Sequence, residues 1–186
     1  MSALDGRPDA EPGCLILTGM PGAGKSTVAP LVAAHHARAA RVNGDVLSYM
    51  VERGRVGFNG TPAEESRRQV LLCARNMCSL AANFADAGIT PVLEHVVADR
   101  EVLDLMTGLL RPRPVRFVVL APSPEVCERR NAARAPEERI DYPIAPLYRA
   151  MEEKLGGVGW WLDSSDLTPE ETAATIAAHA AEKATL

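Results

Sequence analysis

The sequence of 186 residues has few lysines, few aromatic residues and no long apolar segment. Only three lysines accompany 17 arginines, and aromatic residues make up 4% of the chain. No apolar run approaches the roughly 18 residues of a membrane-spanning helix, so no membrane association is expected. The formal net charge is −4, and no basic stripe with interleaved aromatic residues occurs, which argues against nucleic acid as a partner.

The cysteines have neither the pairing nor the spacing of a metal or redox site. Cys14, Cys73, Cys78 and Cys127 form no CxxC pair, and no His/Cys cluster has metal-ligand spacing. They are expected as small buried thiols in a reducing compartment, which predicts a cytoplasmic protein. Residues 1–12 are polar and contain no apolar core, so we interpret them as a flexible tail and not as a signal peptide.

Short apolar runs alternate with helical patterns along the rest of the chain. The predicted strands lie at residues 14–18, 40–43, 89–94, 115–120 and 160–162. This alternation predicts an α/β fold, with a parallel sheet covered by helices on both faces. Because no internal repeat or linker divides residues 13–186, we expect a single domain there.

The most specific motif is Gly19-Met20-Pro21-Gly22-Ala23-Gly24-Lys25-Ser26, which satisfies GxxxxGK[ST] in full. It follows an apolar strand and opens a helix, which is the context of a phosphate-binding P-loop. Glycines let backbone N–H groups turn toward phosphate oxygens, and the helix N-terminus adds positive potential. Lys25 is expected to reach the β- and γ-phosphates of ATP, and the Ser26 hydroxyl to bind Mg²⁺. The predicted ATP-binding residues of the motif are Gly22, Ala23, Gly24, Lys25, Ser26 and Thr27.

Asp45 follows the second predicted strand, about twenty residues after the lysine of the P-loop. In an open parallel sheet, ligands gather beyond the carboxyl ends of the strands, so Asp45 is expected to face the γ-phosphate from the acceptor side. A carboxylate there can orient and deprotonate a hydroxyl group. The alternative is an N-cap of the helix that begins near Val46, and one residue can serve both roles.

Two segments beyond the P-loop, Asn43-Gly44-Asp45 and Phe84-Ala85-Asp86-Ala87-Gly88, resemble the small-molecule kinases of the P-loop superfamily. Gluconate kinase and adenylylsulfate kinase are the nearest patterns. Chloramphenicol phosphotransferase, zeta-type toxins and polynucleotide 5′-kinase are similar in plan. The resemblance covers roughly residues 14–178 and implies a three-layer, nucleoside monophosphate kinase-like fold with five parallel strands and a short lid. It also implies that Asp45 is the catalytic base or the residue that orients the acceptor.

The segment Glu128-Arg129-Arg130-Asn131-Ala132-Ala133-Arg134 resembles the lid of these kinases, here about residues 128–142. Cations in such a lid meet the charge on the transferring phosphoryl group. Arg130 and Arg134 lie four residues apart and share a helix face, so both are candidate catalytic residues, and Arg129 is a candidate nucleotide contact. The alternative is an exposed helix with Glu/Arg pairs.

Three further residues are candidates because of their positions. Glu94 ends the third predicted strand, where many P-loop enzymes carry an Asp that holds Mg²⁺ through water, or it binds the acceptor substrate. Ser164 lies in a loop that resembles the one near the adenine in this class. Arg75, in the middle of a long predicted helix, is a candidate to hold an anionic acceptor, with solvent exposure as the alternative.

These features predict an ATP- and Mg²⁺-dependent kinase that phosphorylates a hydroxyl of a small molecule, acting as a monomer or homodimer. A sugar acid, a nucleotide-like metabolite or an antibiotic would suit as acceptor. The alternatives are a nucleotide-binding regulatory ATPase or switch, and a polynucleotide 5′-kinase. The sequence lacks the Asn-Lys-x-Asp motif of a GTPase and the strong acidic pair of a motor on its third strand.

Overall fold

The computed structural model describes residues 13–136, 139–140 and 143–186, so the predicted tail and part of the predicted lid lie outside it. Within these residues the chain forms five strands and seven α-helices. The strands are β1 (Cys14–Gly19), β2 (Ala39–Asn43), β3 (Thr90–Glu94), β4 (Val115–Leu120) and β5 (Trp160–Leu162). The helices are α1 (Lys25–Ala34), α2 (Gly44–Tyr49), α3 (Ala63–Asp86), α4 (Arg100–Leu110), α5 (Pro124–Ala132), α6 (Ile144–Leu155) and α7 (Pro169–Lys183).

The strands form one sheet in the order β2-β3-β1-β4-β5, and every neighbouring pair is parallel. All residues of β1 and β3 are buried. Such strands are expected as continuous apolar runs, because helices cover both of their faces. The predicted five-stranded parallel sheet is therefore confirmed.

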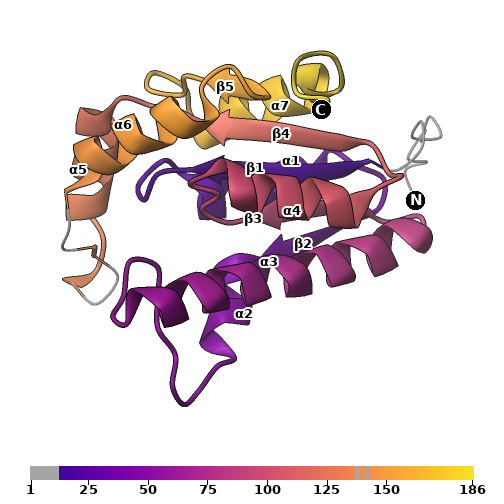
Figure 1. Cartoon of the computed structure of the whole chain (residues 1–186). Helices are drawn as coiled ribbons and strands as arrows, with labels where there is room; N and C mark the ends of the chain where they lie inside the picture. Colours follow the sequence, from indigo (N-terminus) through magenta and orange to yellow (C-terminus); the bar gives the residue numbers. More distant parts are fainter. Residues whose placement is uncertain (1–12, 137–138, 141–142) are drawn as a thin grey trace.

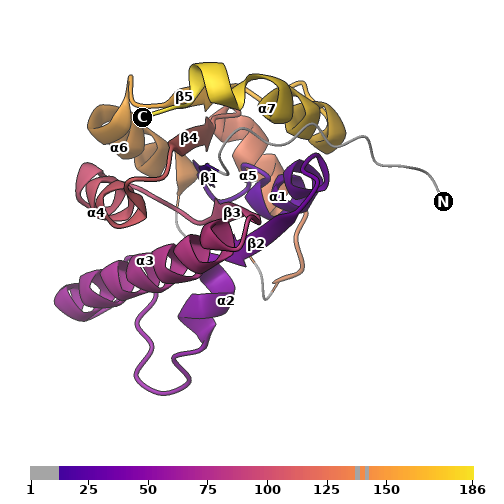
Figure 2. The same ribbon diagram turned by 90° about the vertical axis from the view of Figure 1, so that its right-hand side faces the viewer.

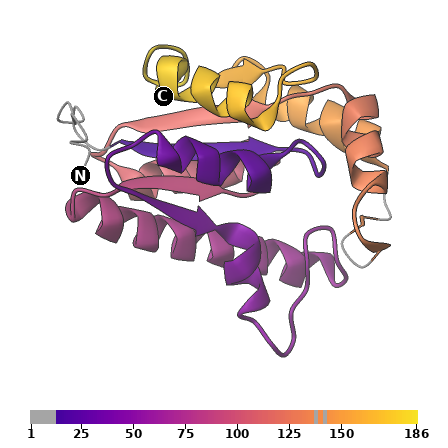
Figure 3. The ribbon, with the colours of Figure 1, turned by 180° about the vertical axis from the view of Figure 1, so that it is seen from behind.

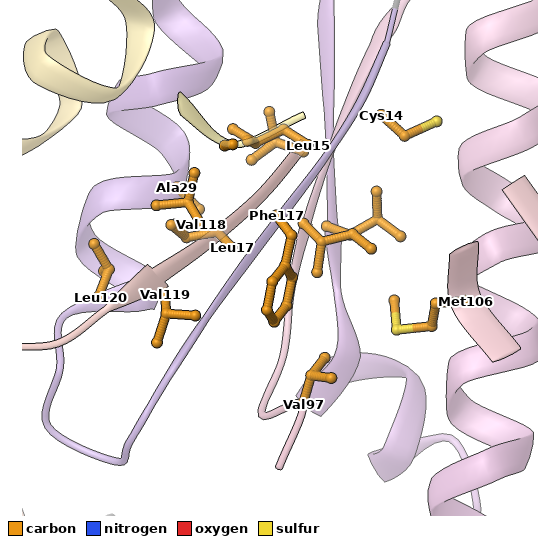
Figure 4. Close-up of a cluster of buried hydrophobic side chains, with 14 of the residues drawn as sticks. Cys14, Leu15, Leu17, Ala29, Val97, Met106, Phe117, Val118, Val119 and Leu120 are labelled. Carbon is orange, nitrogen blue, oxygen red and sulfur yellow. The ribbon is translucent and has the colours of Figure 1, made fainter. Parts of the chain in front are cut away.

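Helices cover both faces of the sheet in the end-on view of Figure 2. Helices α3 and α4 pack together on one face, and α1 packs against α7 on the other, which Figure 3 shows from behind. Side chains of β1 and β4, among them Leu17 and Phe117, meet those of α1 and α4 in the core (Figure 4). The four cysteines are free and buried, as predicted.

The caps of the helices agree in part with the sequence. Thr168 caps α7 in a reciprocal pair with Glu171, and Pro169 follows at the first helical position, both residue types typical of a helix start. The N-cap of α2 is Asn43, whose side-chain oxygen accepts the N–H of Val46 at 3.0 Å. The alternative interpretation of Asp45 as that N-cap is therefore wrong, and its carboxylate is not engaged with the helix backbone in this way.

The carboxyl ends of the strands all lie at one edge of the sheet, on the left in Figure 1. The P-loop, between β1 and α1, and the end of α5 lie at the same edge. Helix α5 ends at Ala132, so Arg134 lies beyond the helix on which the sequence predicts it to share a face with Arg130. None of the helices in the described residues is long and apolar enough to cross a membrane.

Candidate active site

The P-loop is shaped by glycines with a positive φ and by close packing against α5. Gly22 has φ 81° and Gly24 has φ 101°, values that L side chains rarely adopt. A Cβ on Gly22 would overlap the backbone carbonyl of Cys127 in α5. The sequence therefore needs glycine at position 22 for two reasons, the turn and the contact with the helix beneath it.

Lys25 lies at the start of α1 and folds back over the loop. Its Nζ donates to the carbonyl oxygens of Gly19 at 2.8 Å and Met20 at 3.0 Å. Burial lowers the pKa of Lys25 to about 8, an effect that the nearby Asp45 carboxylate partly offsets. The Lys25 ammonium therefore lacks a strong anionic partner. A bound phosphate would supply one.

A pocket of about 190 Å³ opens beside the P-loop, and we call it the P-loop pocket. Lys25, Ser26 and Asp45 all line it, although they come from two different helices. Arg134, just after α5, lines it as well. The full set of lining residues is Pro21, Gly24, Lys25, Ser26, Asp45, Phe58, Glu94, His95, Val96, Arg134 and Ile140.

Asp45 faces His95 across this pocket. Its Oδ1 lies 3.6 Å from Nδ1 of His95, while the Asp45 side chain remains 77% exposed. His95, and more weakly Lys25 and Arg134, hold the pKa of Asp45 below its usual value. Asp45 is therefore an ionised carboxylate that can still reach a ligand in the pocket.

His95 is held in place by its neighbours on β1 and α2. The backbone N–H of His95 donates to the carbonyl of Leu17 at 3.3 Å, and the backbone N–H of Val97 donates to Thr18 Oγ1 at 2.8 Å. A Cβ on Gly44 would overlap the imidazole ring. Glycine at position 44 thus lets the ring lie against the start of α2, beside Asp45.

Glu94 is buried at the end of β3 and binds two residues of β2. Its Oε1 accepts a hydrogen bond from Nε of Arg41 at 2.9 Å and another from the side-chain amide of Asn43. The parallel register sets Asn43 beside Glu94, which explains the contact. Its Oε2 is buried and has no hydrogen-bond partner in the described part of the chain. Because Glu94 lines the P-loop pocket, this oxygen is available to a ligand or an ordered water.

Arg130 connects the P-loop with the loop after β5. Its two terminal nitrogens donate to Ala23 O at 3.4 Å and Ser164 O at 3.3 Å. Both loops line a second, smaller pocket, which we call the α5–α7 pocket, and the buried Oγ of Ser164 has no hydrogen-bond partner there. The residues of this pocket are Ala23, Gly24, Thr27, Val28, Arg130, Ser164, Leu167, Pro169 and Thr172.

Two predicted site residues lie apart from these pockets. Arg129 is exposed on α5 and Arg75 is exposed on α3, and neither lines the P-loop pocket or the α5–α7 pocket. The position of Arg75 agrees with the solvent-exposed alternative. His95 and Arg41 also belong to the site, although no motif in the sequence points to them; His95 directly follows Glu94, and Arg41 lies two residues before Asn43.

The fold and the two pockets define a P-loop nucleotide-binding protein, with the loop at the carboxyl edge of a parallel sheet. The profile of the AAA domain family (AAA_33), a family of P-loop kinases, matches residues 15–152, and the chain belongs to this family. No curated protein matches the chain.

Several solved structures share the fold. The APS kinase CysC of Mycobacterium tuberculosis, in complex with AMPPNP and APS, is 21% identical, with a TM-score of 0.66 over 89% of this chain and 95% of that one. A tunicamycin resistance protein of Deinococcus radiodurans is 14% identical (TM-score 0.67, 93% and 97% covered). A gluconokinase of Sinorhizobium meliloti 1021 is 16% identical (TM-score 0.58, 92% and 93% covered). These likenesses agree with the resemblance inferred from the sequence.

Proposed function

We propose that the protein is an ATP-dependent kinase that transfers the γ-phosphate to a hydroxyl group of a small molecule. The observation that carries the proposal is the P-loop pocket, which is lined by Lys25 and Ser26 and also by the ionised Asp45. A phosphate-binding group and a proton acceptor thus border the same space. Phosphoryl transfer to an alcohol requires this pair of groups.

In the proposed reaction, the hydroxyl oxygen of the acceptor attacks the γ-phosphorus and its proton moves to Asp45. The bond between the γ-phosphorus and the bridging oxygen breaks, and ADP leaves with that electron pair. Lys25 and Arg134 line the pocket and would meet the charge on the phosphoryl oxygens. Arg130 would act from the adenine side, since it already spans the P-loop and the Ser164 loop.

The residues present fit a Mg²⁺ ion bound together with the nucleotide. The Ser26 side chain lines the pocket, and the unpartnered Oε2 of Glu94 could accept a hydrogen bond from water on the metal. No group of three His, Cys, Asp or Glu residues that could hold a metal occurs in the described residues. Ser26, phosphate oxygens and water would therefore be its ligands. Mg²⁺ would neutralise charge on the β- and γ-phosphates.

The test is phosphate transfer from ATP to a pool of hydroxylated metabolites, followed by mass spectrometry. We expect a phosphorylated product from wild type, and at least about a hundredfold less of it from Asp45→Asn, because the proton acceptor is lost. ATP affinity should stay the same in this variant. ATP hydrolysis without any transfer would favour a regulatory ATPase, and normal transfer by Asp45→Asn would remove Asp45 from the mechanism.

A further inference from the structure

The side chain of Asn131, in the last turn of α5, binds the backbone of Ile140, nine residues further along the chain. Its Oδ1 accepts a hydrogen bond from the N–H of Ile140 at 3.2 Å, and its Nδ2 donates to the carbonyl of Ile140 at 3.1 Å. A primary amide carries an acceptor oxygen and two donor hydrogens, so it can satisfy both backbone groups of one residue. We call this pair of hydrogen bonds the Asn131–Ile140 clamp. It ties the end of α5 to a residue late in the predicted lid.

Further hydrogen bonds of this segment surround Arg134. Its backbone N–H donates to the carbonyl of Asn131 at 3.1 Å, and its own carbonyl accepts a hydrogen bond from Nε of Arg139 at 2.8 Å. The backbone N–H of Arg139 in turn donates to the carbonyl of Pro136 at 3.3 Å. Arg134 and Ile140 therefore belong to one hydrogen-bonded segment, which begins and ends at the clamp.

The same two residues, Arg134 and Ile140, line the P-loop pocket, whereas Asn131 does not. Ile140 is half-buried and packs against the core of the protein. With Phe58 and Val96 it forms an apolar part of the pocket wall, around the space that the lysine of the P-loop and the proposed proton acceptor share. Apolar side chains at a reaction centre exclude water, and they strengthen the electrostatic contacts within it.

We propose that Asn131 is a positioning residue for phosphoryl transfer, because the clamp keeps Ile140 in the pocket wall, where its side chain excludes water from the γ-phosphate. The inference rests on the proposed kinase function and extends it to the choice between two nucleophiles, the acceptor hydroxyl and water. Without the clamp, the oxygen of a water molecule would form the new bond to the γ-phosphorus, and its proton would pass to Asp45. ADP would leave with the electron pair of the broken bond, and ATP would be hydrolysed without phosphorylation of the acceptor.

The position of Ile140 can be tested without an acceptor. All four native cysteines are buried, so the new thiol of an Ile140→Cys variant is the one that DTNB labels rapidly. AMPPNP occupies an ATP site without turnover, and it should slow this labelling several-fold because it covers the pocket wall. In Asn131→Ala/Ile140→Cys the protection should be lost, since residue 140 then opens to solvent whether or not nucleotide is bound.

Asn76 supplies the matched control for this labelling experiment, because it is exposed on α3 and lines neither the P-loop pocket nor the α5–α7 pocket. Asn76→Ala/Ile140→Cys should keep the protection by AMPPNP. Equal protection in the Asn131 and Asn76 double variants overturns the proposal, because Ile140 would then hold its position without the clamp.

The choice of nucleophile is measured as the ratio of ATP hydrolysed to acceptor phosphorylated, with an acceptor identified from the metabolite pool. Hydrolysis and transfer would both use Arg134, so their ratio isolates the access of water. We expect the ratio to rise at least about tenfold in Asn131→Ala, while the Kd for ATP stays constant, because the reaction centre is no longer closed to water. Asn76→Ala should keep the wild-type ratio. An unchanged ratio in folded Asn131→Ala overturns the inference and leaves the kinase proposal standing.

Variants of Ile140 test the same step if Asn131→Ala does not fold. Ile140→Ala retains the clamp, whose bonds go to the backbone, but it removes most of the apolar side chain and should raise the ratio. Ile140→Leu conserves the volume and should keep the wild-type ratio. A wild-type ratio in Ile140→Ala overturns the role of this side chain. Transfer to no alcohol by the wild type, with intact ATP binding, overturns the kinase proposal and this inference with it.

Discussion

Nδ1 of His95 lies 3.6 Å from Oδ1 of Asp45, although the two residues follow different strands of the sheet. His95 is 13% exposed and Asp45 is 77% exposed, so the buried ring faces a carboxylate that meets solvent. Nδ1 is itself buried and has no hydrogen-bond partner in the described residues. The ring is therefore in a position to orient Asp45 and to stabilise its charge.

Replacement of His95 by Asn should lower kcat for phosphoryl transfer by about tenfold to a hundredfold, because a misplaced catalytic group costs that much. The Kd for ATP should not change, since the P-loop is untouched. His95 lowers the pKa of Asp45, so the loss of activity at acid pH should begin at a higher pH in the variant. A pH–rate profile of both proteins checks this. An unshifted acid limb would contradict a direct action of His95 on Asp45.

The pKa of Lys25 predicts how ATP affinity depends on pH. The free protein has a Lys25 pKa of about 8, and bound phosphates should raise it. Affinity should therefore be constant below about pH 8 and fall above it, by up to about tenfold per pH unit, as Lys25 loses its proton in the free protein. Titration calorimetry from pH 6.5 to 9.5 measures this. Lys25→Arg stays charged, and the decrease should be absent in it.

Arg130 and Arg129 are a matched pair for testing the predicted lid. Arg130 reaches Ala23 and Ser164, whereas Arg129 is exposed on α5. Arg130→Ala should lower kcat/KM by about tenfold to a hundredfold, because loss of its hydrogen bonds to the P-loop and the Ser164 loop would misplace the nucleotide. Arg129→Ala should change it by less than about threefold. Equal losses in steady-state kinetics would mean that Arg129 also contacts the nucleotide, as the sequence predicts.

The ion pair of Glu94 and Arg41 is expected to support the sheet. The Glu94 side chain is 3% exposed and that of Arg41 35%, so Arg41→Ala leaves a buried carboxylate short of a cation. We expect a loss of about 2 kcal/mol in the free energy of unfolding, below the value for a fully buried pair because Arg41 meets solvent. Urea unfolding measures it. The Arg41→Ala/Glu94→Gln double variant should recover part of the loss, and no recovery would contradict the charge argument.

Local signals in the sequence were sufficient for most of the fold. The P-loop motif and the apolar runs identify β1 and β4. The expectation that Arg130 and Arg134 share one helix was wrong, because the helical spacing of the arginines continues past Ala132, where α5 ends. The N-cap of α2 was also missed, since Asn43 and Asp45 are both suitable capping residues.

The candidate site was less accessible to sequence reasoning, because its contacts depend on which strands are neighbours. The pairing of β2 with β3 brings Arg41 and Asn43 to Glu94. No local pattern encodes that register. A further pocket, lined by residues of α3 and α6, likewise joins segments about ninety residues apart in the chain. The sequence did indicate Lys25, Asp45 and Arg134 as members of one site, and all three line the same pocket.

The close contact between Gly22 and Cys127 has different consequences for the mobility of Arg130 and of Arg134, the two arginines of the predicted lid. Because α5 rests directly on the P-loop at this point, the helix cannot tilt without disturbing the loop. Arg130, within α5, is thus fixed to the same rigid body as the phosphate-binding backbone. Arg134 follows the last turn of the helix, so a pivot between these two residues would let one arginine travel while the other keeps its place.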